Sequence, residues 1–186
     1  FLISGFTPGS DIRNFGFENS LNFSNKILII SSIIFFYLLP FFIYFKEHLL
    51  LKKIALIEVF LIFLFSFFNI FFFNYKTEYT GGGIFFQFSN YLFNNNILFF
   101  LISTYSLIII YSIFLKNKNL YNLSLILILF FSNPQLSIYH KYYDPLLILM
   151  FLTIFNLDFK KNYFNYKNLF LLNAFYLTFL FLNFLK

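Results

Sequence analysis

The sequence predicts an all-α integral membrane protein, a polytopic bundle of about six hydrophobic helical segments with one broken helix pair. Of its 186 residues, 60% are hydrophobic and only 11% are charged, which is typical of proteins inserted in a bilayer. The apolar residues form runs close to the ~20 residues with which a helix crosses about 30 Å of hydrocarbon. Lysines stand at the ends of these runs, where they can contact anionic lipid headgroups.

The composition also excludes several classes of function. The absence of Cys excludes disulfides, thiolate metal sites and a Cys nucleophile. The net charge of +6 comes from lysines that flank apolar runs, so we expect membrane lipids as partners and no nucleic acid. The 36 Phe accompany many Ile, Asn, Lys and Tyr, all encoded by AT-rich codons, so they do not indicate a binding role. We expect no cofactor.

The first elements follow from composition along the chain. Residues 1–26 are rich in Gly, Asn and Ser, which predicts a non-cytoplasmic loop or surface segment. Because the chain begins with Phe and lacks a charged stretch before an apolar core, we expect a fragment of a longer protein without a signal peptide. The transmembrane domain is expected over residues 27–186. Its first span should be kinked at Pro40. The first three spans are predicted at residues 27–45, 54–73 and 97–115.

Two shorter runs and a last span complete the domain. At 1.5 Å of rise per residue, residues 120–131 climb only ~18 Å and residues 145–157 only ~20 Å. Neither run crosses a ~30 Å core, so the polar stretch around 132–145 should lie about 10 Å below the outer surface. Irregular backbone at that depth must be buried in protein or line an aqueous cavity, and such breaks often mark ligand sites. The last span is predicted at residues 168–185.

The lysines also predict the topology. The loops at 46–53, 116–119 and 158–167 hold eight of the 13 basic residues, and all three fall on one side if the polar stretch turns back on the other. That side is then cytoplasmic. The opposite side collects the N-terminal segment, a glycine triplet and the polar stretch. We expect a multi-pass protein of the bacterial inner (plasma) membrane.

The polar stretch contains the main candidates for ligand binding. Asn133–Pro134 and Asp144–Pro145 are helix-start pairs that explain the break by themselves. They do not explain a cationic Lys and His beside Tyr hydroxyls, which suit a phosphate or pyrophosphate group, although the tyrosines also fit an interfacial belt. Metal binding is not expected, because Pro145 places Asp144 at a break. The candidate substrate-binding residues here are Gln135, Tyr139, His140, Lys141, Tyr142, Tyr143 and Asp144.

Further candidates lie outside this stretch. Gly81, Gly82 and Gly83 allow close backbone approach to a ligand, or simply form a tight turn. Residues 84–93 after them have the pattern of an amphipathic helix on the membrane. Glu58, the only acid within a span, is either a proton relay or a residue that snorkels to the cytoplasmic edge. Polar side chains within spans should face other helices; these are Ser66, Asn69, Ser103, Thr104, Ser106, Asn173 and Thr178.

The block NPQLSIYHKYYDPLLIL, which follows GGGIFFQFSNYLF and a short lysine-rich loop, resembles the C-terminal half of polytopic glycosyltransferases of the GT-C superfold. The resemblance covers residues 74–157. It implies a lipid-linked (polyprenyl-phosphate) sugar donor, bound on the non-cytoplasmic side by His140, Lys141 and the neighbouring tyrosines. The family carries its catalytic acid in a first outer loop near the N-terminus, which we expect in a part of the longer protein that precedes this sequence, so the catalytic residues are unknown.

Other functions remain open beside the glycosyltransferase. A broken helix pair also defines transport sites, which favours a transporter, flippase or polysaccharide-export protein. A small subunit of a membrane complex is the third alternative, and Glu58 would then carry protons. Whether the chain belongs to an enzyme is therefore undecided by the residues themselves.

Overall fold

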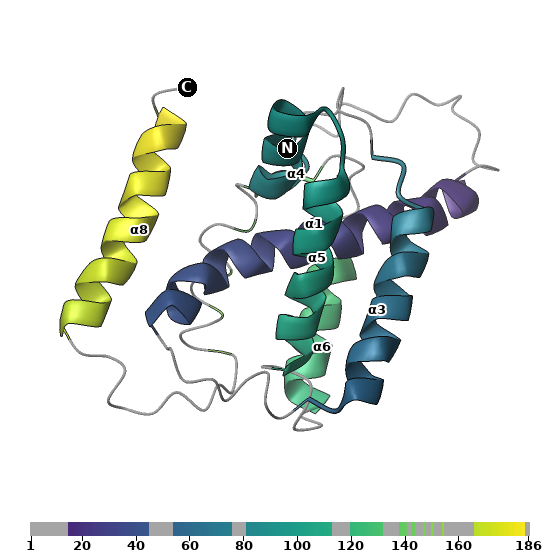
Figure 1. Ribbon diagram of the computed structural model, residues 1–186, viewed down its shortest axis with the longest axis horizontal. Coiled ribbons are helices and arrows are strands. Elements are labelled where there is room, and N and C mark those ends of the chain that lie inside the picture. Colours follow the sequence, from purple (N-terminus) through teal and green to yellow (C-terminus); the bar gives the residue numbers. More distant parts are fainter. Residues whose placement is uncertain are drawn as a thin grey trace.

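The structure is a computed structural model in which every regular element of the described residues is helical (Figure 1). This confirms the all-α, bundle-like part of the predicted fold. The six α-helices of the described part are α1 (Phe15–Tyr44), α3 (Leu56–Phe71), α4 (Gly83–Phe93), α5 (Ile97–Ile110), α6 (Leu120–Phe131) and α8 (Tyr166–Phe184). The structure describes residues 15–44, 54–75, 81–112, 120–131, 138–140, 143, 147, 150, 154 and 166–184.

Most predicted spans coincide with observed helices. The run at residues 120–131 is α6 from end to end, and α3 and α8 lie within two residues of the predicted bounds. The amphipathic segment at 84–93 is helical as α4. The expected segment at 145–157 lies mostly outside the described residues.

Helix α1 differs from its prediction at the N-terminal end. It begins at Phe15, so residues 15–26 are helical where a loop or surface segment was expected. Ser24 and Asn25 are buried, and the Asn25 amide donates to Asn74 Oδ1 at 2.7 Å. Burial against the neighbouring helices has therefore overridden the loop composition of this segment. Pro40 lies inside the same helix.

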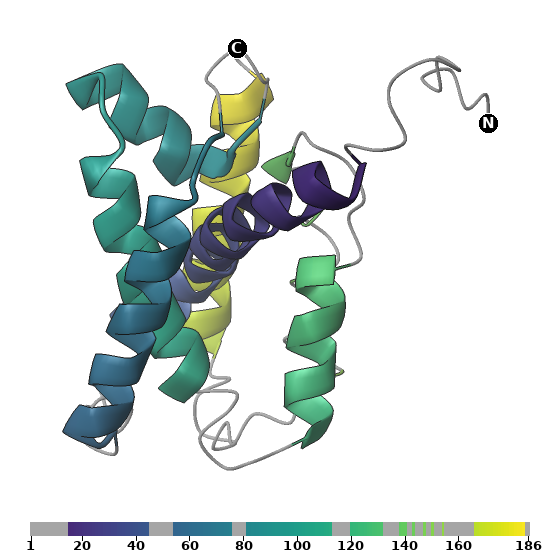
Figure 2. The same ribbon diagram turned by 90° about the vertical axis from the view of Figure 1, so that its right-hand side faces the viewer.

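The arrangement of the helices is set by α1. In two perpendicular views, α3, α5, α6 and α8 run in similar directions, while α1 crosses them obliquely (Figures 1 and 2). The side chains of α1 form the centre of the core, with Leu28, Ile29, Ile30 and Ile34 at 0% exposure. α1 is also the one helix of the described chain that is long and apolar enough to cross a bilayer, over Phe23–Pro40.

Small hydroxyl side chains join α1 to α5. Ser103 Oγ donates to Leu28 O at 3.1 Å, and Ser106 Oγ donates to Ser31 O. Both serines are fully buried. Such short side chains let two backbones approach closely while every hydroxyl proton finds an acceptor. The predicted helix-facing position of these two serines is confirmed.

Helix α3 is attached to α5 through polar side chains as well. Ser66 and Thr104 lie 2.6 Å apart. Thr104 donates its single hydroxyl proton to Phe100 O at 2.8 Å, so Ser66 must be the donor of the pair. Ser66 and Asn69 are the two buried residues of α3, which confirms that they face other helices.

The same expectation is wrong for α8. Asn173 and Thr178 are exposed rather than turned toward another helix. The Asn173 amide donates to Leu169 O at 2.9 Å, and the Thr178 hydroxyl donates to Phe175 O at 2.8 Å. Their polar groups are satisfied by their own helix, so they need no partner helix.

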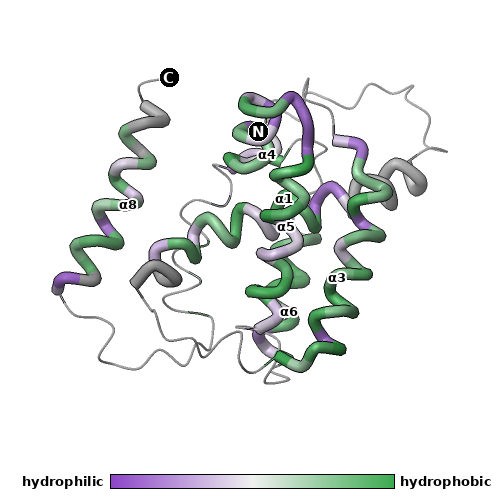
Figure 3. Tube along the Cα trace, viewed as in Figure 1, coloured by the Kyte–Doolittle hydropathy of each residue, from purple (hydrophilic) through white to green (hydrophobic). Residues whose placement is uncertain are grey.

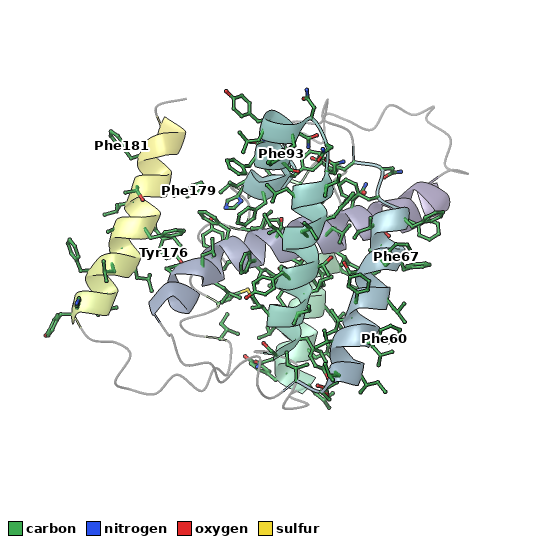
Figure 4. The ribbon with its side chains drawn as sticks, viewed as in Figure 1. Phe60, Phe67, Phe93, Tyr176, Phe179 and Phe181 are labelled. Atoms are coloured by element: carbon green, nitrogen blue, oxygen red, sulfur yellow. The ribbon has the colours of Figure 1, made fainter. Side chains whose placement is uncertain are left out.

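Helix α3 has its polarity inside out. Its buried residues are the polar Ser66 and Asn69, at 0% and 1% exposure, whereas most of its large apolar side chains are exposed. Phe60 and Phe67, at 59% and 61% exposure, extend away from the bundle (Figure 4). Figure 3 shows the same helix as a largely hydrophobic tube at the edge of the molecule. A helix exposed to water normally shows the opposite distribution.

Candidate functional site

The glycine triplet forms a left-handed turn at the start of α4. Gly81, Gly82 and Gly83 have φ values of 131°, 83° and 78°, a region that other residues adopt only with strain. Gly82 is the residue that precedes the first turn of α4. The tight-turn interpretation of the triplet is therefore supported by the backbone conformation.

The turn is also a site of close approach, and the group that approaches is the polar stretch itself. Gly82 N donates to Ile138 O at 2.8 Å, and Ile138 N donates to the Tyr75 hydroxyl at 3.3 Å. A Cβ atom added to Gly81 would lie 2.6 Å from Ile138 O. The two candidate segments, 57 positions apart by the difference between 138 and 81, are thus in contact through their backbones.

His140 lies two residues further on, among aromatic rings of α1 and α8. The imidazole centroid is 5.2 Å from the ring of Phe36 and 5.3 Å from the rings of Tyr37 and Phe179. Removal from water lowers the pKa of His140 to about 4 because the charged form loses its hydration. At pH 7 the imidazole is therefore neutral, and the cationic His140 expected from the sequence is corrected.

The other predicted residues divide into two groups. Tyr143 is buried and Tyr139 is half-buried, and Tyr143 N donates to His140 O at 2.9 Å in a helical turn. A position within the protein, rather than in an exposed belt, is thus observed for Tyr143. The remaining candidates lie outside the described residues; these are Gln135, Lys141, Tyr142 and Asp144.

Glu58 has a structural role at the N-terminus of α3. Its Oε2 accepts a hydrogen bond from Ala55 N at 3.0 Å, three residues before it. A carboxylate in this position satisfies a free amide of the first turn and interacts favourably with the helix dipole. Capping of α3 is thus a sufficient explanation for Glu58, the one acid in a predicted span, and a proton relay is not needed to explain it.

Sequence reasoning missed the residues that surround His140. Phe36, Tyr37 and Phe179 stand within apolar runs, where an aromatic residue at a site is indistinguishable from one that only packs. Tyr37 is 1% exposed, and its hydroxyl has no hydrogen-bond partner among the described residues. Tyr176 of α8 donates to the backbone oxygen of Tyr37 at 2.7 Å. Tyr176 and Phe179 extend from α8 toward α1 (Figure 4).

The described residues contain no group of three or more His, Cys, Asp or Glu side chains that could hold a metal ion. Comparison of the chain with protein-family models, with curated proteins and with solved structures finds no match.

Proposed function

We propose that this chain is the multi-pass membrane domain of a GT-C-like glycosyltransferase that uses a polyprenyl-phosphate sugar on the non-cytoplasmic side. The membrane part of the proposal is carried by the inverted polarity of α3. The donor part rests on the contact between the glycine turn and the polar stretch, together with the resemblance of residues 74–157.

The inverted polarity favours lipid as the surroundings of α3. Six of its phenylalanines are between 46% and 77% exposed, and its polar side chains Ser66 and Asn69 are turned inward. At roughly 25 cal/mol per Å² of apolar surface, contact with water would cost free energy at each of these rings. Hydrocarbon removes that cost, and it also favours the burial of Ser66 and Asn69 against other helices. The exposed phenylalanines are Phe60, Phe63, Phe65, Phe67, Phe68 and Phe71.

Tryptophan fluorescence tests this placement, because the natural chain has no Trp. We expect Phe67→Trp, reconstituted in nanodiscs, to be strongly quenched when brominated phosphatidylcholine replaces the unbrominated lipid. The matched control is Phe99→Trp, since Phe99 is 0% exposed, and its emission should change little. Equal, weak quenching of both variants would contradict a lipid-facing α3.

The donor part of the proposal assigns a charge to Lys141. His140 is neutral at pH 7 because burial lowers its pKa to about 4, so the donor phosphate needs another cation, and Lys141 is the next residue in the sequence. Lys acts as a point charge toward phosphate. In the transfer, the acceptor oxygen bonds to the anomeric carbon and gives its proton to a base, while the bond from that carbon to the phosphate oxygen breaks. Polyprenyl phosphate leaves.

Transfer is measured as release of polyprenyl phosphate from a polyprenyl-phosphate hexose by membranes that contain the protein. We expect Lys141→Ala to abolish release while the protein remains inserted. Lys160→Ala, in the loop predicted to be cytoplasmic, is the matched control and should keep the wild-type rate. No release by the wild-type protein, or equal rates in the two variants, would refute the proposed function.

A further inference from the structure

We propose that the hydroxyl of Tyr37 is a ligand-binding group, which donates a hydrogen bond to an oxygen of the lipid-linked sugar. This inference rests on the proposed function, because it names a further residue of the same site. Tyr37 lies on α1, far in the sequence from both segments that carry the candidate residues, and it is brought to them only by folding.

The first observation is the state of the hydroxyl. Tyr37 is 1% exposed, and its hydroxyl oxygen has no hydrogen-bond partner in the part of the chain that the structure describes. Most buried side-chain polar groups in proteins have such a partner, because an unsatisfied one costs free energy. A phenylalanine at this position would keep the ring contacts without that cost. Packing therefore explains the ring of Tyr37 but not its hydroxyl group.

The second observation is the position of the ring. The ring is tilted by 34° against that of His140, with 5.3 Å between centroids, and by 31° against that of Tyr176, with 5.7 Å between centroids. The Tyr176 hydroxyl bonds the backbone oxygen of Tyr37 at 2.7 Å, so α8 holds the residue in place from the other side. His140 follows Ile138, which is bonded to the glycine turn. Tyr37 therefore lies beside the candidate site, and the hydrogen bond from α8 fixes its position.

The surroundings of the ring define the ligand chemistry. The rings that contact Tyr37 and His140 are aromatic and largely apolar, contributed by Phe36 on α1 and Phe179 on α8. A phenol hydroxyl in such a setting offers one directed donor to an oxygen, while aromatic faces accept the apolar side of a sugar ring or a hydrocarbon chain. A lipid-linked sugar combines both features.

The experiment compares Tyr37→Phe with Tyr176→Phe in the purified protein. Binding of a polyprenyl-phosphate hexose is titrated by native mass spectrometry, with polyprenyl phosphate as a second probe. We expect Tyr37→Phe to raise Kd for the hexose lipid about tenfold and to leave the ligand-free melting temperature unchanged or higher. Tyr176→Phe loses its bond to the Tyr37 carbonyl, so it should lower the melting temperature. If only the hexose lipid loses affinity in Tyr37→Phe, the acceptor is a sugar oxygen; if both probes do, it is a phosphate oxygen.

Three results would overturn the inference. A lower melting temperature of ligand-free Tyr37→Phe, comparable with that of Tyr176→Phe, would mean that the hydroxyl is bonded within the protein. Wild-type affinity in Tyr37→Phe, with normal binding by the wild-type protein, would refute the role of Tyr37 and leave the proposed function standing. Absence of binding by the wild-type protein would refute the proposed function, and the role of Tyr37 with it.

Discussion

Gly81→Ala is expected to detach the polar stretch from the glycine turn and to lower stability by about 2–4 kcal/mol. The new Cβ would lie 2.6 Å from Ile138 O and 3.0 Å from the Tyr75 hydroxyl. The first of these atoms is backbone and cannot rotate away. At φ of 131° the alanine is also strained in its own conformation. Relief requires movement of the segment that carries His140.

The absence of Cys from the chain makes this movement measurable. A single Tyr139→Cys reports on the segment through its rate of reaction with a water-soluble maleimide, which should rise when Gly81→Ala is added. Gly83→Ala is the control, because it has a φ of 78° but meets the side chain of Ile33 at 3.1 Å. Equal maleimide reaction rates of Tyr139→Cys with Gly81→Ala and with Gly83→Ala would show that backbone strain, and not the contact with Ile138, sets the accessibility of the segment.

Acidification is expected to destabilise the protein through His140 by up to about 3 kcal/mol. The pKa of the imidazole falls from 6.5 to about 4 in the folded state because burial removes its hydration. Between these two values the unfolded chain binds the proton and the folded protein does not. The contribution of neutral His140 to the free energy of unfolding is therefore complete above pH 6.5, and it is lost as the pH falls toward 4.

This pH dependence is measured as the melting temperature between pH 7 and pH 4, followed by circular dichroism. His140→Phe keeps an aromatic ring among those of Phe36, Tyr37 and Phe179 and removes the titrating group. The difference in melting temperature between wild type and variant should therefore change across this range, while the carboxylates contribute equally to both. A constant difference would contradict the burial of a neutral His140.

The helices were predictable because their signals are local. Residues 120–131 form one uninterrupted apolar run, and the structure makes them α6 without change of bounds. The start of α1 was missed, since Ser24 and Asn25 resemble a loop until Asn74 from a distant segment bonds to Asn25. Local composition indicates the propensity of a segment for helix or loop. Burial against residues far away in the chain can nevertheless make a segment with loop composition helical.

The candidate site was predicted in part for the same reason. Gly81–Gly83 and His140 were both identifiable, because glycine clusters and polar residues stand out in an apolar sequence. Their contact could not be derived, since it depends on one backbone hydrogen bond between Gly82 and Ile138. Tyr37 was not identifiable at all, because nothing in an apolar run distinguishes a hydroxyl that is satisfied from one that is not.

By itself the sequence determined that this protein is helical, which segments are apolar, and that a polar break interrupts them near His140. These properties follow from hydrophobicity and length along a continuous stretch of chain. Only the tertiary structure decided that the polar side chains of α3 turn inward, that His140 is neutral at pH 7, and that Tyr37 lies beside it. Burial and pKa depend on which distant residues exclude water from a group, and that is settled only when the helices pack.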